Sequence, residues 1–341
     1  MDVPVLDAHN RPLANLRLSV TDRCNLRCQY CMPEEDYLWL PREDILQFEE
    51  IERLVDQFVS LGVDKVRLTG GEPLLRRDLP TLVEQLARKS AIRDLAMTTN
   101  AVLLKPAVND LKAAGLHRLT ISLDTLQRDR FIKLARFDEL PRVLAGIDAA
   151  VDPFPGFKID TVIIRGVNDD EIIPLLDFAK ARGAEIRFIE YMDVGGATTW
   201  SMSQVVSRKD MLAMIEAHYG PVVPLRELSS APADRYRMPD GTIFGIIAST
   251  TEPFCKSCDR SRLTADGVWY LCLYAGRGID LRGPLRGGVS DEALRELITG
   301  VWHARTDRGA EQRLSVRERS PLIPLQALKR DPHLEMHTRG G

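Results

Sequence analysis

The stretch that decides the fold is Asp22-Arg23-Cys24-Asn25-Leu26-Arg27-Cys28-Gln29-Tyr30-Cys31-Met32-Pro33. Three residues separate its first two cysteines, and two residues separate the second and the third. Soft thiolates this close together, on a polar loop, suit a metal ion or an iron-sulfur cluster. A cubane 4Fe-4S cluster has four irons, so three thiolate ligands leave one iron free to bind a small molecule.

Other uses of three neighbouring cysteines are open at this point. A structural zinc site needs four protein ligands, and no further cysteine or histidine follows until His117. Disulfide bonds belong to oxidising compartments, and no signal peptide precedes the loop. The pattern therefore favours an iron-sulfur cluster over zinc and over disulfides.

Length and composition set the broad class. The chain has 341 residues, 44% of them hydrophobic, and a formal net charge of -3. This size predicts one large domain with a smaller one, and the charge gives no sign of nucleic acid or of an anionic membrane as a partner. No apolar run approaches the roughly 18 residues of a membrane span, so we expect a cytoplasmic protein. The six cysteines divide into three near each end of the chain, which predicts two metal sites.

Short apolar strands alternate with helical stretches over the first two thirds of the chain. The predicted strands are 16–20, 65–69, 95–99, 118–123, 157–165 and 185–192. Helix 49–61 is typical of the intervening stretches, because its apolar residues fall on one face. Such alternation predicts a parallel sheet covered by helices, and six units are fewer than the eight of a closed barrel. The fold class is therefore α/β, a partial (β/α)6 TIM-like barrel with an open side.

The pattern changes after a helix predicted at 208–218. Turn signals at 239–242 and 265–268 separate short strands there. We place a domain boundary between residues 220 and 221. Residues 1–220 form the barrel, and residues 221–341 form a smaller α+β domain that carries the second cysteine set.

Three of the predicted strands carry a cation between apolar neighbours: Arg17, Arg67 and Lys158. In a parallel sheet covered by helices the apolar neighbours face the helices, so these cations point into the lumen. One of them alone could equally mark an exposed edge strand. The three together predict a polyanionic ligand inside the barrel.

Polar and glycine-rich segments end several strands. Thr69-Gly70-Gly71-Glu72-Pro73 ends the second strand, where glycines let the backbone approach a ligand closely. Thr98-Thr99-Asn100, Ser122-Leu123-Asp124 and Met192 end later strands, at the edge where barrels bind ligands. Each segment alone could be a strand cap or core filler.

The second cysteine set is Cys255, Cys258 and Cys272, with Arg260-Ser261-Arg262 between them. A zinc site completed by a distant residue, such as His303, remains an alternative to a second cluster with an open iron. Guanidinium groups bind phosphate in a bidentate manner and stay charged. Beside a cluster that accepts substrate, the two arginines are candidate phosphate ligands.

The first cysteine loop and the Gly-Gly-Glu-Pro strand end resemble the radical S-adenosylmethionine (SAM) superfamily. The second set, with its Arg-Ser-Arg-Leu-Thr-Ala-Asp-Gly run and the terminal Gly340-Gly341, closely resembles the GTP 3',8-cyclases of molybdenum cofactor biosynthesis. The resemblance extends over nearly the whole chain. It implies that a 5'-deoxyadenosyl radical abstracts the C3' hydrogen of GTP and that the ribose radical cyclises onto guanine C8. The product would be (8S)-3',8-cyclo-7,8-dihydroguanosine 5'-triphosphate.

The resemblance also assigns roles to individual positions. Two 4Fe-4S clusters would be held by Cys24, Cys28 and Cys31 and by Cys255, Cys258 and Cys272. SAM would be bound by Tyr30, Gly71, Glu72, Ser122 and Met192. GTP would be bound by Arg17, Arg67, Thr98, Lys158, Arg187, Arg260, Ser261 and Arg262. Catalytic roles would fall to Arg17, Gly340 and Gly341.

Two positions depart from the family pattern. Ala101 stands where a glycine usually follows Thr-Thr-Asn, and Arg339 replaces a more apolar residue before the twin glycines. The first departure concerns the local turn, and the second concerns how the tail docks.

The resemblance further implies a homodimer, a low-potential electron donor and transfer of the product to cyclic pyranopterin monophosphate synthase. Two alternative functions remain open. One is a radical SAM enzyme that modifies peptides, which would not need the paired arginines. The other is a non-catalytic iron-sulfur or zinc protein, such as an electron carrier or a redox sensor.

Overall fold

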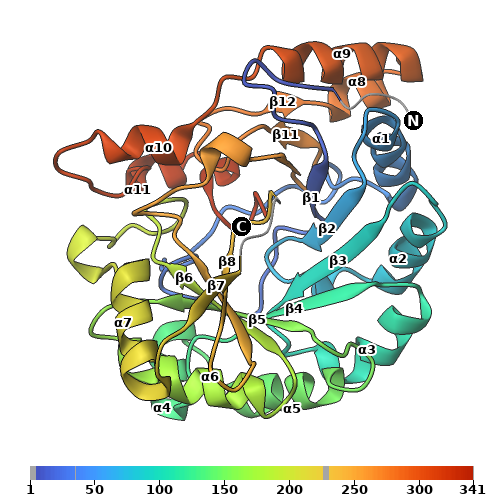
Figure 1. The fold of residues 1–341 in the computed structure, drawn as a ribbon. Coiled ribbons are helices and arrows are strands. Elements are labelled where there is room, and N and C mark those ends of the chain that lie inside the picture. The colour runs from blue at the N-terminus through green and yellow to red at the C-terminus, as the bar shows by residue number, and fades with distance from the viewer. Residues whose placement is uncertain (1–4, 35, 226–229, 341) are drawn as a thin grey trace.

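The computed structural model describes residues 5–34, 36–225 and 230–340, and its described strands join into one sheet (Figure 1). The six predicted strands are all present, and each pairs in parallel with the next. They are β1 (Asn15–Ser19), β2 (Lys65–Thr69), β3 (Asp94–Thr99), β4 (Arg118–Ser122), β5 (Lys158–Ile163) and β6 (Glu185–Glu190).

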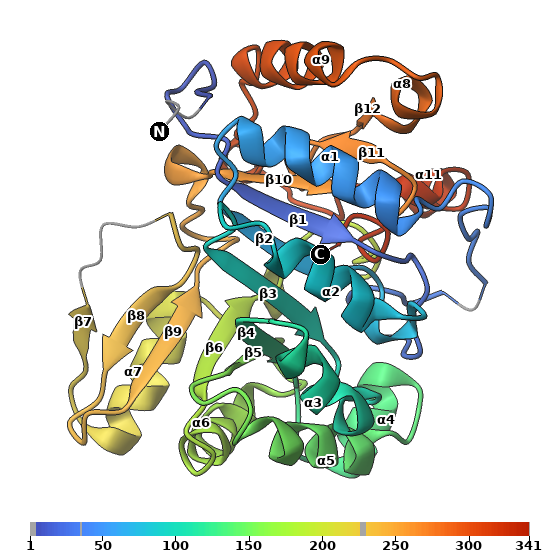
Figure 2. The ribbon, with the colours of Figure 1, turned by 90° about the vertical axis from the view of Figure 1, so that its right-hand side faces the viewer.

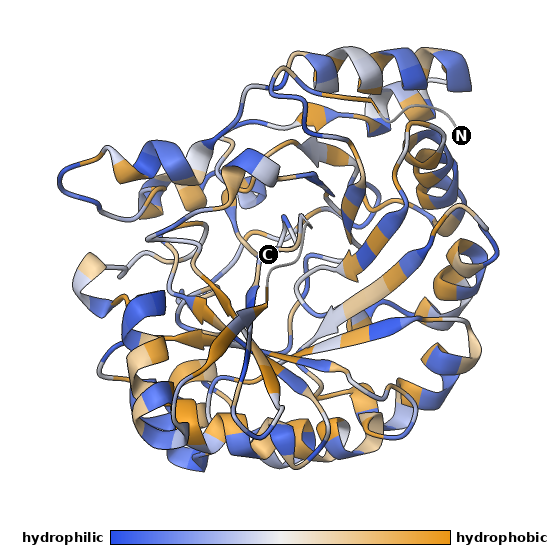
Figure 3. Ribbon diagram, viewed as in Figure 1, coloured by the Kyte–Doolittle hydropathy of each residue, from blue (hydrophilic) through white to orange (hydrophobic). Residues whose placement is uncertain are grey.

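Helices cover the outer face of these strands (Figure 2). They are α1 (Phe48–Ser60), α2 (Leu79–Ala87), α3 (Leu104–Ala113), α4 (Arg128–Ala135), α5 (Leu140–Ala150) and α6 (Ile172–Lys180). Helix α1 buries Ile51, Leu54, Val55 and Phe58, which recur at helical spacing on one face. Figure 3 shows the same division throughout, with apolar residues toward the sheet and polar residues on the outer helix faces.

The last third of the chain adds strands to both sides of the six. Strand β9 pairs in parallel with β6, and β10 pairs in parallel with β1. The sheet order is β12-β11-β10-β1-β2-β3-β4-β5-β6-β9-β8-β7, so β12 and β7 are the edges and the sheet does not close. The predicted partial barrel is confirmed.

The added strands are β7 (Val223–Leu225), β8 (Asp234–Arg237), β9 (Ile243–Ile247), β10 (Arg260–Leu263), β11 (Val268–Tyr270) and β12 (Ile279–Asp280). The helices of this part are α7 (Arg208–Tyr219), α8 (Arg282–Arg286), α9 (Asp291–His303), α10 (Gly309–Leu314) and α11 (Leu325–Leu328). The predicted turns at 239–242 and 265–268 connect β8 with β9 and β10 with β11. The predicted boundary at 220 and 221 falls between α7 and β7 and stays a prediction, while the sheet runs on across it.

Side-chain alternation along the strands separates a core from a lumen. Leu16 and Leu18 are fully buried in the hydrophobic core between sheet and helices, whereas Arg17 between them lines the central cavity. Arg67 and Lys158 follow the same rule. The prediction that these three cations face the lumen is therefore confirmed.

The last described residues of the chain lie inside the opening of the partial barrel (Figure 1). None of the described helices combines the length and the apolar character that crossing a bilayer requires.

Candidate functional site

A cavity of about 560 Å³ lies at the centre of the partial barrel. All six cysteines line it, although more than two hundred residues of sequence separate the two sets: Cys24, Cys28, Cys31, Cys255, Cys258 and Cys272. Among the described residues, no three His, Cys, Asp or Glu side chains converge closely enough to hold a single metal ion. A cubane cluster binds each thiolate to a different iron and does not need such convergence.

The first cysteine loop folds back on itself directly after β1. The amides of Cys31 and Met32 both donate to the Cys28 carbonyl, at 2.9 and 2.6 Å, and all three cysteines of the loop line the cavity. Burial raises the pKa of Cys24 to about 11, and burial together with the neighbouring charges raises the pKa of Cys28. Thiols in such surroundings become thiolates when cationic iron binds them. The loop therefore fits a cluster.

The cysteine loop is locked against the Gly-Gly-Glu-Pro turn. The Gly71 amide donates to the Thr21 carbonyl at 3.0 Å, and the Glu72 amide donates to the Arg23 carbonyl at 2.8 Å. A Cβ atom on Gly71 would lie 2.3 Å from the Arg23 oxygen. Gly70 has a φ of +148°, and a Cβ there would lie 2.4 Å from the Thr21 oxygen. Both glycines are thus required by the close approach of the two backbones.

We expect Gly71→Ala to displace the cysteine loop, because the methyl group would overlap backbone and not a movable side chain. Overpacking of this kind typically costs about 1–3 kcal/mol, so we expect SAM affinity to fall about tenfold or more. Anaerobic titration of the reconstituted protein with SAM measures this.

A matched control is Gly300→Ala in α9, where a Cβ meets no atom within 4 Å. This variant should bind SAM as the unmodified chain does. Equal SAM affinity for both variants would contradict the packing argument.

Glu72 is completely buried, and its carboxylate accepts three hydrogen bonds from the protein. The donors are the Leu74 amide at 3.1 Å, the Asn100 amide at 2.7 Å and the Thr99 hydroxyl at 2.7 Å. Burial raises the pKa of this carboxyl group to about 7. Glu72 is not among the residues that line the cavity, so it braces the ends of β2 and β3. Its predicted contact with SAM stays a prediction.

The other residues assigned to SAM all line the cavity: Tyr30, Gly71, Ser122 and Met192. The Tyr30 hydroxyl donates to Asp124 at 2.7 Å, and the other oxygen of Asp124 accepts from the Val162 amide at 2.9 Å. Asp124 therefore fixes the tyrosine across the barrel. Burial raises the pKa of Asp124 to about 6.

A row of arginines crosses three neighbouring strands. Arg17 on β1 is in register with Arg262 on β10 and with Arg67 on β2, and all three line the cavity. Like charges directly opposite each other destabilise a sheet. Burial and the charges of Arg262 and Arg67 lower the pKa of Arg17. Unlike Arg67 and Arg262, the Arg17 guanidinium group has no hydrogen bond or ion pair with any part of the chain that the structure describes. This row of three neighbouring arginines therefore suits an anionic ligand.

Further cations of the site extend this row. Arg67 donates to the hydroxyl groups of Thr98 and Thr120, at 3.0 and 2.9 Å. Lys158, Arg187, Arg260 and Thr98 also line the cavity, and their contacts with GTP stay predictions. Ser261 is different, because it pairs with Leu16 of the core and is not a lining residue. Its predicted contact with GTP stays a prediction.

The pKa of Lys158 is lowered to about 8 by burial and by the charges of Arg187 and Arg118. Its positive charge is therefore lost as the pH rises through about 8, which weakens the attraction for an anion. A bound triphosphate restores the charge, so we expect GTP affinity to fall about tenfold between pH 7 and pH 9. Isothermal titration of the anaerobic protein with GTP measures this fall.

The Lys158→Arg variant keeps its charge at both pH values and controls for titration of the nucleotide itself. The difference between the two proteins is the contribution of Lys158. Equal pH dependence in both would contradict the assignment.

Asp160 is among the carboxylates of the wall that were missed from the sequence. It lies two residues after Lys158 on β5, lines the cavity and is in register with Arg187. Its Oδ1 atom is buried and has no hydrogen-bond partner among the described residues. The two-residue period of a strand could have revealed it, since residues 158 and 160 must share a face.

Arginines also fix the second cysteine set. Arg11 donates to the Cys255 carbonyl at 3.0 Å, and Arg305 donates to the Cys258 carbonyl at 3.0 Å. Both arginines pair with the buried carboxylate of Asp7, at 2.6 and 3.3 Å. Although burial opposes it, the charges of Arg260 and Arg305 lower the pKa of Cys258 to about 7. This thiol is therefore ready to become a thiolate ligand.

The C-terminal tail docks beside the second set. Arg339 donates to the carbonyls of Leu273 and Ala275, at 3.0 and 2.7 Å, and its guanidinium lies 4.3 Å from the centre of the Tyr270 ring. Arg262 in turn donates to the Gly340 carbonyl at 2.5 Å. The departure at Arg339 thus anchors the tail to the loop of Cys272. Gly341 lies outside the described residues.

The departure at Ala101 has a local cost. Its φ is +62°, in the left-handed region, where a residue with a Cβ is destabilised by about 1 kcal/mol relative to glycine. The Thr99 hydroxyl accepts a hydrogen bond from the Ala101 amide at 3.0 Å, which stabilises the turn.

Comparisons with known proteins agree with this geometry. Residues 18–179 match the Radical SAM superfamily model, and residues 184–311 match Molybdenum Cofactor Synthesis C. GTP 3',8-cyclase 1 of Mycobacterium tuberculosis H37Rv is 57% identical over 99% of this chain and 96% of its own length. GTP 3',8-cyclase 3 of Mycobacterium bovis is 54% identical, over 99% and 91%.

Solved structures show the same fold. Streptococcus suis SuiB bound to S-adenosylmethionine matches with a TM-score of 0.61 at 16% identity, over 91% of this chain and 70% of its own. At that identity the likeness concerns the fold alone. From the two family models and the near full-length relatives, we conclude that the chain belongs to the GTP 3',8-cyclase family of the radical SAM superfamily.

Proposed function

We propose that the protein is a radical SAM GTP 3',8-cyclase, which catalyses the first step of molybdenum cofactor biosynthesis. The proposal rests on the observation that two cysteine sets face one cavity together with a row of arginines for which the described residues provide no ion pair. When bound, the two 4Fe-4S clusters and SAM supply the 5'-deoxyadenosyl radical chemistry that removes the C3' hydrogen of GTP and closes the bond to guanine C8. A non-catalytic electron carrier would need neither the arginine row nor a cavity of this size.

The cationic wall binds the triphosphate. GTP carries roughly four negative charges near neutral pH, and an anion of that charge enters a poorly solvated cavity only where cations meet it. Arg17, Arg67 and Lys158 supply these charges from three strands, joined by Arg187, Arg260 and Arg262. Asp160 lies among them and limits their mutual repulsion. A peptide substrate would leave most of these charges without partners.

The chain's own residues fix the relative positions of the reactants. Cys24, Cys28 and Cys31 would hold one cluster, with Tyr30, Gly71, Ser122 and Met192 around SAM. Cys255, Cys258 and Cys272 would hold the other cluster, which would interact with GTP. Because SAM and GTP are then held in one cavity, the reacting atoms are oriented and water is excluded.

The tail completes the enclosure. Gly340 has a φ of +65°, and a Cβ there would lie 2.4 Å from the Thr69 hydroxyl. A glycine is therefore needed for the tail to reach this depth. With the catalytic roles proposed for Arg17, Gly340 and Gly341, the tail closes the site over the substrate.

Isotope transfer tests the proposal directly. The anaerobic protein with reconstituted clusters receives SAM, dithionite and GTP deuterated at C3'. We expect deuterium in the 5'-deoxyadenosine, measured by mass spectrometry. Deoxyadenosine without deuterium would refute C3' of GTP as the source of the hydrogen. If protein with intact clusters forms no deoxyadenosine at all, the proposed radical SAM activity is refuted.

Partners and location complete the proposal. The protein acts as a cytoplasmic homodimer, takes electrons from a low-potential donor and passes its product to cyclic pyranopterin monophosphate synthase. These assignments are supported by membership of the family and not by contacts in the structure.

A further inference from the structure

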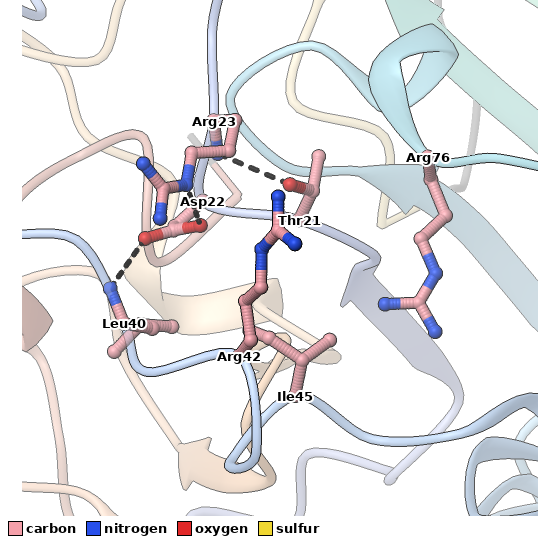
Figure 4. Close-up of a pocket in the computed structure, with 7 residues that line it drawn as sticks. All are labelled: Thr21, Asp22, Arg23, Leu40, Arg42, Ile45 and Arg76. Carbon is pink, nitrogen blue, oxygen red and sulfur yellow. Dashed lines mark hydrogen bonds and ion pairs between the residues drawn. The ribbon is translucent and has the colours of Figure 1, made fainter.

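A second pocket, of about 340 Å³, lies behind the first cysteine loop (Figure 4). Its lining carries three arginines and one acidic residue: Thr21, Asp22, Arg23, Leu40, Arg42, Ile45 and Arg76. Figure 4 shows the Arg42 guanidinium between those of Arg23 and Arg76. None of these residues has a part in the proposed chemistry.

Two of the arginines stack on aromatic rings, and Arg76 also donates to the Leu46 carbonyl at 2.8 Å, which leaves part of its N–H edge available. The Arg23 guanidinium lies 4.6 Å from the centre of the Trp39 ring, and that of Arg76 lies 5.0 Å from the centre of the Phe48 ring. Stacking uses the flat face of a guanidinium group and leaves its N–H edge for an anion. Arg42 is exposed, and its side chain has no hydrogen bond or ion pair with the residues that the structure describes.

Among the described residues that line the pocket, Asp22 is the one acidic residue, and it already has partners. Asp22 is buried, accepts a hydrogen bond from the Leu40 amide at 2.6 Å and lies 3.5 Å from Arg23. One carboxylate therefore offsets one of three guanidinium groups. A net positive pocket on a chain of net charge -3 is a local feature and not a general property of its surface.

The pocket lies next to the start of the first cysteine loop. Asp22 and Arg23 line the pocket, and the next residue, Cys24, lines the central cavity. The pocket and the first cluster would thus lie on opposite sides of one stretch of backbone. Arg23 and Arg42 are exposed to solvent, and neither lines the central cavity, which SAM, GTP and the tail would fill.

We propose that this pocket is the docking point of an acidic one-electron carrier protein that reduces the first cluster. The inference rests on the proposed function, which requires an electron at that cluster. In the step, the carrier is oxidised by one electron and the cluster held by Cys24, Cys28 and Cys31 is reduced by one. Carboxylates of the carrier pair with Arg42, Arg76 and Arg23, as charge complementarity at transient interfaces predicts.

Comparison of two reductants tests the proposal. The full-length protein with both clusters is supplied with either reduced flavodoxin, an acidic flavin carrier, or dithionite, a small molecule that needs no docking site. We expect Arg42→Glu to slow 5'-deoxyadenosine formation about tenfold or more with flavodoxin at low salt, and to leave the dithionite rate unchanged. With flavodoxin, the unmodified chain should slow as salt rises, while the variant should change little.

A matched control is Arg142→Glu on α5, which reverses an exposed arginine whose surface ion pair contributes little. It should behave as the unmodified chain with both reductants. Equal flavodoxin rates for the Arg42 and Arg142 variants would overturn the docking site, and so would equal slowing of the Arg42 variant with both reductants. Failure of the unmodified chain with dithionite would instead refute the proposed function.

Discussion

Cys28→Ser is expected to abolish 5'-deoxyadenosine formation, whereas Cys258→Ser is expected to retain it and to lose only the cyclised product. Each serine replaces a soft thiolate with a hydroxyl group, which is a poor ligand for iron-sulfur clusters. Cys28 accepts two backbone hydrogen bonds within the first loop, while Cys258 is held by Arg305 in a separate loop. Damage to one set should therefore leave the other in place. For each lost reaction we expect a fall of roughly 10³-fold or more, about 4 kcal/mol of barrier.

Three measurements separate the two variants. Iron and sulfide content gives the number of clusters, electron paramagnetic resonance of the reduced protein shows which cluster remains, and mass spectrometry counts deoxyadenosine against cyclised product. GTP binding should survive in the Cys28 variant, because the arginine row lies on strands β10, β1 and β2 and not on that loop. Cyclisation by the Cys258 variant at the unmodified rate would contradict a substrate-binding role of the second cluster.

Much of the barrel could be predicted from the sequence because its signals are local. Each of the six strands is a short apolar run, and the two-residue period of a strand decides which side chains face the lumen. For Arg17 and Arg67 that period was enough. The same rule places Ser261 opposite to Arg260 and Arg262, so its core-side position was available from the sequence as well.

What could not be predicted depends on pairing between distant segments. Strands β9 and β10 join β6 and β1, and no local pattern states which edge a strand will take. The register that aligns Arg17 with Arg262 follows only from this pairing. The same holds for the tail, whose Arg339 binds carbonyl groups more than sixty residues earlier in the chain. Glu72 is a further example, because its three hydrogen bonds to the protein form only when the chain has folded.

Arg17→Ala is expected to change stability and activity in opposite directions. In the free protein this cation lines the cavity beside Arg67 and Arg262, and the charge of Asp160 offsets their repulsion only in part, since the pKa of Arg17 stays well below its usual value. Its removal relieves repulsion and desolvation, so we expect the free energy of unfolding to rise by about 1 kcal/mol. With GTP bound, the same cation pairs with phosphate, and its loss should cost about 3 kcal/mol of binding, or a hundredfold in affinity.

The two effects are measured on one preparation. Thermal unfolding without nucleotide should show a higher Tm for Arg17→Ala, while titration with GTP shows the weaker binding and product analysis shows a cyclisation rate at least a hundredfold lower. Formation of 5'-deoxyadenosine should persist, because Tyr30, Gly71 and Ser122 lie outside the arginine row. Arg17→Lys keeps the charge but loses the bidentate geometry. Its GTP affinity and its cyclisation rate should therefore lie between those of the unmodified chain and those of Arg17→Ala. A chain that loses stability with Arg17→Ala, or keeps full cyclisation, would show that the residue supports the fold and not the substrate.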